Sequence, residues 1–167
     1  KHLGGRLVAD FRTVHSASWM GGDRDGHPTV TAAVTRSVLW LSRWMAADLY
    51  LRDINGLLAD FSMTVASEEL LAVTGASHEP YRVLLRDVRE RLQNTRQRME
   101  ALLEKKQPSH GAWYAKSDEL RDSLLLVDRS LRACGMGPIA DGELRNTLWR
   151  LDSFGISLLR LDIRQES

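Results

Sequence analysis

The chain has 167 residues, of which 43% are hydrophobic and 27% are charged, and its formal net charge is +1. These values are ordinary for a globular domain with a core of its own, and the small net charge excludes a global attraction to nucleic acid or to an anionic membrane. The single cysteine, Cys134, cannot form an internal disulfide, which favours a reducing compartment, and no apolar run is long enough to span a bilayer. We therefore expect a cytoplasmic protein with neither nucleic acid nor a membrane as a partner.

The first predicted element is a short strand over residues 11–20, where β-branched, aromatic and small residues are frequent. It leads into residues 21–28, which contain three glycines and one proline and are therefore a loop. Glycines let a backbone approach a ligand closely, and Trp19 beside such a loop can line a dry pocket. A surface turn with local salt bridges is an equally good interpretation of the same residues.

Helical spacing of apolar residues predicts a long helix after this loop. Thr29 or Thr31 is expected to cap it, and the pattern persists towards Phe61. The residues that carry the pattern are Val30, Val34, Val38, Leu41, Met45, Leu49 and Ile54. A short second helix should run from Ser67 to Thr74, with Gly75 as its C-terminal stop.

The third predicted helix begins at Pro80, where a first-turn proline is favoured, and reaches about Lys106, before Pro108. One apolar face marks it: Leu84, Leu85, Val88, Leu92, Met99, Leu102 and Leu103.

Two further helices are predicted, one capped by Ser117 and ended by Gly135, the other capped by Asp141 and ended by Gly155. Their inward residues are expected to be Leu120, Leu124, Val127 and Leu131 in the first, and Leu144, Leu148 and Leu151 in the second.

The hydrophobic period changes to two in the last segment, which predicts a strand over about residues 156–164. One face carries Leu159, Leu161 and Ile163, and the other carries Arg160, Asp162, Arg164 and Glu166. The strand is either an edge strand with its polar face in water, or a barrel strand whose charged face lines an active site. In the second case an arginine is the residue expected to bind a phosphate, because its planar guanidinium donates two parallel hydrogen bonds.

Two stretches of the sequence resemble signature motifs of the phosphoenolpyruvate carboxylase family. These are Ser-Trp-Met-Gly-Gly-Asp-Arg-Asp-Gly at 18–26 and Leu-Asp-Ile-Arg-Gln-Glu-Ser at 161–167, in the family's order and separated by a helical stretch of suitable length. Leu-Ser-Arg-Trp at 41–44 and Ala-Cys-Gly-Met-Gly at 133–137 look similar too. The resemblance covers the chain from about residue 10 to its end, and it departs at His27, where the family usually has asparagine.

The resemblance implies an enzyme that carboxylates phosphoenolpyruvate with bicarbonate to give oxaloacetate and phosphate, that needs Mg or Mn, and that is an allosterically regulated homotetramer. The family fold is a (β/α)8 TIM-type barrel surrounded by extra helices. We therefore expect a mostly α chain, a helical segment of such a barrel enzyme with short strands near each end, and residues 1–167 as a single partial domain. A chain that opens on Lys1 and stops at Ser167 after a charged run also favours a piece of a longer polypeptide.

The same resemblance suggests roles for individual residues. Arg164 is similar to an arginine that binds the phosphate of phosphoenolpyruvate, and Trp19 to a tryptophan that lines the bicarbonate pocket. The loop residues expected in the active-site wall are Gly21, Gly22, Asp23, Arg24 and Asp25, with the two aspartates orienting arginines and not binding metal. The family's Thr-Ala-His-Pro-Thr-Glu stretch with the catalytic histidine is absent. We therefore assign no catalytic residue here, expect the metal ligands outside this sequence, and expect the isolated chain to be inactive.

Two alternatives come from other classes of protein. A helical nucleic-acid-binding module is suggested by six arginines on one predicted helix: Arg82, Arg86, Arg89, Arg91, Arg96 and Arg98. Part of this positive charge is expected to be compensated on the same helix, because Arg86 lies four residues before Glu90 and Asp87 lies four residues before Arg91. A helical protein-interaction module is suggested by the helix count and four tryptophans, although tryptophans at helical spacing are more often core residues: Trp40, Trp44, Trp113 and Trp149.

Overall fold

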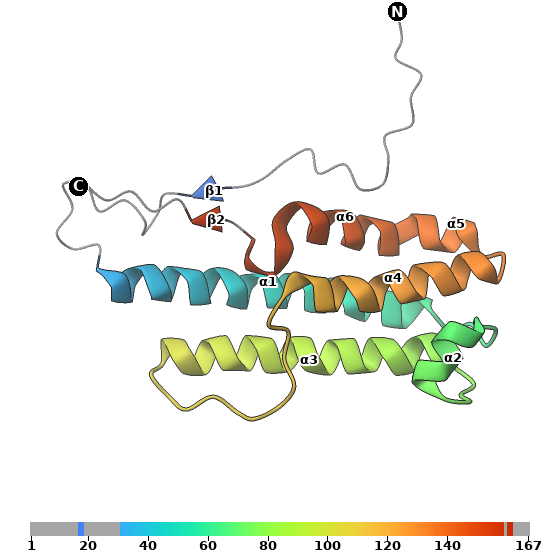
Figure 1. Cartoon of the computed structure of the whole chain (residues 1–167), viewed down its shortest axis with the longest axis horizontal. Coiled ribbons are helices and arrows are strands. Elements are labelled where there is room, and N and C mark those ends of the chain that lie inside the picture. Colours follow the sequence, from blue (N-terminus) through green and yellow to red (C-terminus); the bar gives the residue numbers. More distant parts are fainter. Residues whose placement is uncertain (1–16, 19–30, 159, 162–167) are drawn as a thin grey trace, which may run out of the picture.

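The computed structural model describes residues 17–18, 31–158 and 160–161, and these residues are mostly helical. The elements in chain order are β1 (Ala17–Ser18), α1 (Ala32–Asp60), α2 (Glu68–Thr74), α3 (Pro80–Leu103), α4 (Ser117–Ala133), α5 (Gly137–Ile139), the π-helical turn η1 (Ala140–Leu144), α6 (Arg145–Phe154), the 3-10 turn η2 (Gly155–Ser157) and β2 (Arg160–Leu161). Figure 1 shows α1 and α3 as one antiparallel pair and α4 and α6 as a second pair beside it. The mostly helical prediction is thus confirmed.

Several helix ends lie where the sequence predicts them. The Thr31 side chain accepts a hydrogen bond from the Val34 N–H at the start of α1, and Ser67 caps α2. Gly75 ends α2 with a φ of 70°, a backbone conformation that favours glycine. Pro80 is in the first turn of α3 as expected, while α3 ends at Leu103, slightly before the predicted end.

Two predicted N-caps are wrong. Ser117 is the first helical residue of α4, and its hydroxyl oxygen accepts a hydrogen bond from the Ile156 N–H. Asp141 lies inside η1 and pairs with Arg132 and Arg145, because helical structure already begins at Gly137 and the chain kinks only after Asp141, at Gly142 (φ −85°, ψ −133°). The presence of Pro138 in the first turn of α5 explains this earlier start.

The core lies between the four long helices and is built largely from leucines. The predicted inward residues of α4 and of the segment formed by η1 and α6 are all buried, which confirms their faces: Leu120, Leu124, Val127, Leu131, Leu144, Leu148 and Leu151. Phe61 and Tyr81 meet edge to face at a centroid distance of 6.3 Å, where the segment after α1 packs on α3. The Tyr81 hydroxyl is hydrogen-bonded to Ser130 of α4, so its burial leaves no polar atom of the ring unsatisfied.

Helix α1 exists as predicted, but it buries a different face from the one whose spacing predicted it. Four of the residues that carry the pattern are 40–50% exposed: Val34, Leu41, Met45 and Leu49. The face turned to the core consists mainly of Ala46, Ala47, Tyr50, Leu51, Ile54 and Leu57. The helix is therefore apolar on two opposite sides, and the described residues cover one of them.

The two strands form a minimal parallel ladder. Ala17 pairs with Arg160, and Ser18 pairs with Leu161. Residue 156 is not part of a strand, because Ile156 lies in η2 and Leu158 has a φ of 59°. The remainder of the predicted strands over 11–20 and beyond residue 161 lies outside the described residues.

Candidate functional site

The seven site residues suggested by the family resemblance lie outside the described residues: Trp19, Gly21, Gly22, Asp23, Arg24, Asp25 and Arg164. The structure instead shows how the chain approaches these two segments. Trp19 follows β1 directly in the sequence, and the Leu-Asp-Ile-Arg motif begins with Leu161 of β2. Because β1 and β2 are paired in parallel, Ser18 and Leu161, their last residues, lie side by side. The two motifs therefore start from neighbouring positions.

The turn that directs the chain from α6 into β2 is fixed by contacts with two other helices. Gly155 has φ 61° and ψ −164°, a combination that is essentially restricted to glycine. Its carbonyl oxygen accepts a hydrogen bond of 2.9 Å from the hydroxyl of Tyr50 in α1. The next N–H, that of Ile156, donates to Ser117 Oγ of α4 at 3.0 Å. The turn η2, which precedes β2, is thus attached to both α1 and α4.

The environment of Tyr50 keeps its hydroxyl protonated. Burial raises the pKa of Tyr50 well above its usual value, and the nearby carboxylate of Asp53 acts in the same direction. Asp53 in turn forms an ion pair of 2.8 Å with Arg150 of α6, and Arg150 also contacts Glu143 at 2.8 Å. These contacts bring α1, η1 and α6 together around the turn, and the neutral phenol remains a hydrogen-bond donor to Gly155.

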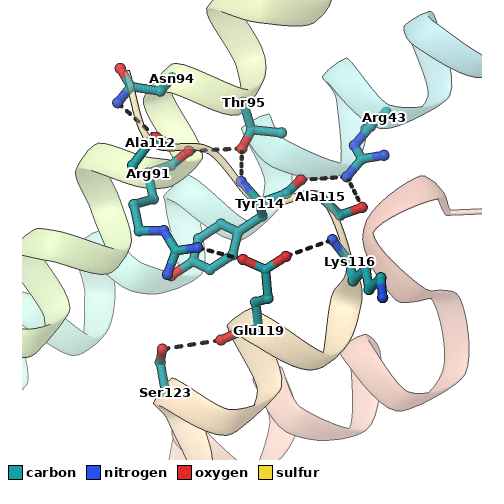
Figure 2. A network of polar contacts seen from close by, with 10 residues as sticks. All are labelled: Arg43, Arg91, Asn94, Thr95, Ala112, Tyr114, Ala115, Lys116, Glu119 and Ser123. Atoms are coloured by element: carbon teal, nitrogen blue, oxygen red, sulfur yellow. Dashed lines mark hydrogen bonds and ion pairs between the residues drawn. The ribbon is translucent and has the colours of Figure 1, made fainter. Parts of the chain in front are cut away.

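A second polar network holds the segment between α3 and α4 (Figure 2). Thr95, which is fully buried, donates to the Arg91 carbonyl at 2.7 Å and accepts from the Tyr114 N–H at 2.9 Å. The Asn94 side chain donates to the Ala112 carbonyl at 2.9 Å. Thr95 therefore satisfies a buried backbone donor for which this segment has no helical or strand partner.

Arg43 connects α1 to the same segment. Its guanidinium donates to the backbone carbonyls of Tyr114 and Ala115, as Figure 2 shows, and lies 5.1 Å from the ring centroid of Trp113. Arg98 of α3 also approaches that indole, at 4.6 Å. Burial lowers the pKa of Arg43, although an arginine remains charged at any physiological pH. The Leu-Ser-Arg-Trp stretch at 41–44 thus contributes a cation that organises backbone, a role that the sequence did not reveal.

Two arginines of α3 pair with carboxylates of other helices, and Arg91 does so in place of the pairing with Asp87 that the sequence predicts. Arg91 pairs with Glu119 of α4 at 2.6 Å and stacks on the Tyr114 ring, and Arg96 pairs with Asp48 of α1 at 2.8 Å. The hydrogen bond from Arg96 is the main reason why the pKa of Asp48 is lowered. Because these guanidiniums join helices, they do not form a row of cations available to phosphates, which argues against the nucleic-acid-binding alternative.

Among residues 31–158, no three histidine, cysteine, aspartate or glutamate side chains come close enough together to hold a metal ion. No helix in the described part of the chain combines the length and the apolar character needed to cross a bilayer. The interpretation of the four tryptophans as core residues is wrong: Trp149 is 52% exposed and lies against Arg145, and Trp40, Trp44 and Trp113 are only half-buried. The polar contacts described above position backbone segments and join helices.

Comparison with known proteins agrees with the motifs. A family model for phosphoenolpyruvate carboxylase matches residues 1–167. The chain is 65% identical over 159 residues to phosphoenolpyruvate carboxylase of Alcanivorax borkumensis and 53% identical over 161 residues to that of Stutzerimonas stutzeri. The corresponding protein of Vibrio parahaemolyticus is 50% identical over 167 residues.

These alignments cover 95%, 96% and 99% of the chain, respectively. They cover only 18%, 18% and 19% of the three relatives, so the chain spans about a fifth of the length of the curated relatives it matches. A match over the whole chain at this identity leaves one conclusion: the chain belongs to the phosphoenolpyruvate carboxylase family.

Proposed function

We propose that this chain is a segment of an enzyme that carboxylates phosphoenolpyruvate with bicarbonate and releases oxaloacetate and phosphate. The family match over residues 1–167 carries the proposal, and relatives at 50–65% identity bear the same name. Because the chain spans about a fifth of those relatives, the activity belongs to a longer polypeptide, and the 167-residue chain alone is inactive.

The segment contributes part of the active-site wall through residues 18–26 and 161–167. In barrel enzymes the chemistry takes place at the C-terminal ends of parallel strands. The parallel pairing of β1 with β2 supports this arrangement, since each motif begins at the last described residue of its strand. In this proposal β1 and β2 belong to two strands of a (β/α)8 barrel, and α1 to α6 form part of the helical layer around it.

Individual roles follow from side-chain chemistry. Arg164 binds the phosphate of phosphoenolpyruvate, because a guanidinium donates two parallel hydrogen bonds to phosphate oxygens. Trp19 lines the bicarbonate pocket and excludes water, which protects an enolate and the carbon dioxide that it attacks. Asp23 and Asp25 orient arginines. These assignments rest on the family motifs together with the neighbouring positions of Ser18 and Leu161.

The described residues do not fit a Mg or Mn site, because residues 31–158 bring no three suitable side chains together. We therefore place the metal ligands elsewhere in the full-length polypeptide and assign no step to the ion here. What residues 31–158 do in this proposal is positional. Tyr50 and Ser117 fix the turn that leads into β2, and thereby the place from which the second motif starts. Assembly as an allosterically regulated cytoplasmic homotetramer is part of the same proposal.

The test is oxaloacetate formation by the full-length protein, measured with phosphoenolpyruvate, bicarbonate and Mg or Mn present, and with each omitted in turn. We expect oxaloacetate and phosphate in equal amounts, and product formation only when both substrates are present. The purified 167-residue chain is the matched control and should form none above a no-protein blank. A full-length protein that forms no oxaloacetate, or an active 167-residue chain, would contradict the proposal.

A further inference from the structure

Helix α1 carries a continuous apolar stripe on the side that faces away from the core of the described residues. We define the α1 stripe as Val34, Val38, Leu41, Met45 and Leu49. Leu41, Met45 and Leu49 are 50%, 47% and 43% exposed, respectively, although Ala46 and Tyr50 in the same turns are almost completely buried. The exposure is therefore a property of one face and not of a fraying helix end.

The stripe is regular along the helix. Its members are four, three, four and four residues apart in the sequence, so all five lie on one side of α1. The stripe ends at the ion pair between Asp48 and Arg52, where the Arg52 side chain is 74% exposed. A helix that is apolar on two opposite sides is typical of the interior of a larger protein, because single exposed leucines are common but a continuous apolar row on each of two faces is not.

We propose that the α1 stripe is an intramolecular interface, covered in the full-length enzyme by another helix of the same polypeptide that lies outside these 167 residues. The inference rests on family membership and not on the catalytic roles proposed above. The relatives align with this chain over 18–19% of their length, so about four-fifths of a full-length polypeptide is available to supply the covering helix.

The size of the stripe decides between this occupant and a second copy of the chain. At a rise of 1.5 Å per residue it is about 22 Å long, and with a helix width of about 10 Å it offers on the order of 200 Å². A stable interface between separate molecules needs about 800 Å² from each partner. A covering segment of the same polypeptide needs no such area, because the covalent connection makes the contact intramolecular.

The spacing of the stripe also selects a helix as its occupant. Apolar residues three or four positions apart form a row close to the direction of the helix axis, and such a row packs against a second helix that crosses at a shallow angle of about 20°. On its opposite face α1 already lies against a helix, its antiparallel neighbour α3 (Figure 1).

Photo-cross-linking in the full-length enzyme tests the inference. A benzoylphenylalanine is placed at Leu41 in one variant and at Met45 in a second, so that the failure of one variant to fold leaves the other. Asn55, an exposed polar residue of α1 beyond the stripe, carries the probe in the control. We expect adducts at positions 41 and 45 to peptides of the same polypeptide outside this chain, with no change in subunit mass on a denaturing gel, and little adduct at position 55.

Three results would overturn the inference: adducts that double the subunit mass, which identify a second copy; adducts confined to residues 1–167; and yields no higher than at position 55.

An independent test places a charge on the stripe and measures thermal stability. Met45→Lys in the full-length enzyme should lower the midpoint of thermal unfolding by several degrees, whereas Asn55→Lys should leave it nearly unchanged. Equal midpoints for these two variants would show that the stripe faces water.

Discussion

Replacing Gly155 by alanine perturbs the turn between α6 and β2, and Gly75 provides a matched control elsewhere in the chain. Gly155 has φ 61° and ψ −164°, and Gly75 has φ 70° and ψ −177°, so both end a helix in nearly the same glycine-only conformation. The two sites differ in their surroundings. A Cβ at Gly155 meets Ser117 Oγ at 3.1 Å, whereas a Cβ at Gly75 has no neighbour within 4 Å.

The expected magnitudes follow from these two features. Backbone strain in this region costs about 1–3 kcal/mol for an alanine at either position. Alanine also lowers the entropy of the unfolded chain, but this contribution is common to both variants and cancels in their comparison. At Gly155 the serine hydroxyl must also shift away from the new methyl group, which weakens its hydrogen bond with the Ile156 N–H by about 1 kcal/mol. We therefore expect Gly155→Ala to be about 1 kcal/mol more destabilising than Gly75→Ala.

Urea unfolding of the 167-residue chain, followed by circular dichroism, measures both free energies of unfolding. The double variant Gly155→Ala/Ser117→Ala isolates the crowding, because without the hydroxyl the additional cost at Gly155 should largely disappear. Equal costs for Gly155→Ala and Gly75→Ala would refute the idea that Ser117 is held rigidly against the turn. A cost near zero for both would refute the strained conformations themselves.

Three further predictions concern buried polar groups and the proposed site. Thr95→Val should cost about 1–3 kcal/mol in the urea unfolding of the 167-residue chain, because it leaves the buried Tyr114 N–H without its acceptor; Thr95→Ser keeps the hydroxyl and should cost clearly less. Burial raises the pKa of Tyr114 to about 12 and also raises that of Tyr50, whereas an unfolded tyrosine titrates near 10. The unfolded chain therefore loses these protons first as the pH rises above about 10, and the free energy of unfolding should fall by up to ~1.4 kcal/mol per pH unit for each tyrosine; a pH series with Tyr114→Phe should show a smaller slope. In the full-length enzyme, Trp19→Ala should raise the KM for bicarbonate more than that for phosphoenolpyruvate, and unchanged bicarbonate kinetics would remove Trp19 from that pocket.

Local signals in the sequence were sufficient to predict most helix ends. Thr31 and Ser67 offer side-chain oxygens to the first free N–H groups of their helices, and Gly75 ends α2 in the conformation that only glycine adopts easily. Each of these signals acts within four residues, so no knowledge of tertiary contacts is needed. Asp141 looked like an equally good cap, but Pro138 had already started a helix upstream.

Long-range contacts could not be predicted in the same way. Arg91 had Asp87 within reach on its own helix, yet it pairs with Glu119 of α4, because the packing of α3 against α4 brings that carboxylate closer. The two apolar sides of α1 presented a related problem. Both satisfy helical spacing, and only the position of α3 and the turn η2 decides which one is buried here.

For the candidate site, the sequence motifs supplied the residues, and the structure supplied the relation between them. Nothing in the spacing of residues 18–26 and 161–167 indicates that their starting points are neighbours. The parallel pairing of β1 with β2 shows that Ser18 and Leu161, where the two motifs start, are neighbours. The contacts of Tyr50 and Ser117 with the turn could not be predicted from the sequence, because their partners, Gly155 and Ile156, lie far along the chain and contribute backbone atoms that carry no residue-specific signal.

The most direct test of the central claim is the steady-state kinetics of Arg164 variants in the full-length enzyme. If Arg164 binds the phosphate of phosphoenolpyruvate, Arg164→Ala should lower kcat/KM for that substrate by roughly ten- to a hundredfold, since a hydrogen bond to a charged group contributes about 1.5–3 kcal/mol. Arg164→Lys should recover only part of this loss, because an ammonium group cannot reproduce the two parallel hydrogen bonds. Circular dichroism of each variant checks that it is folded. A folded Arg164→Ala enzyme with an unchanged kcat/KM for phosphoenolpyruvate would contradict the assignment of this segment to the active-site wall.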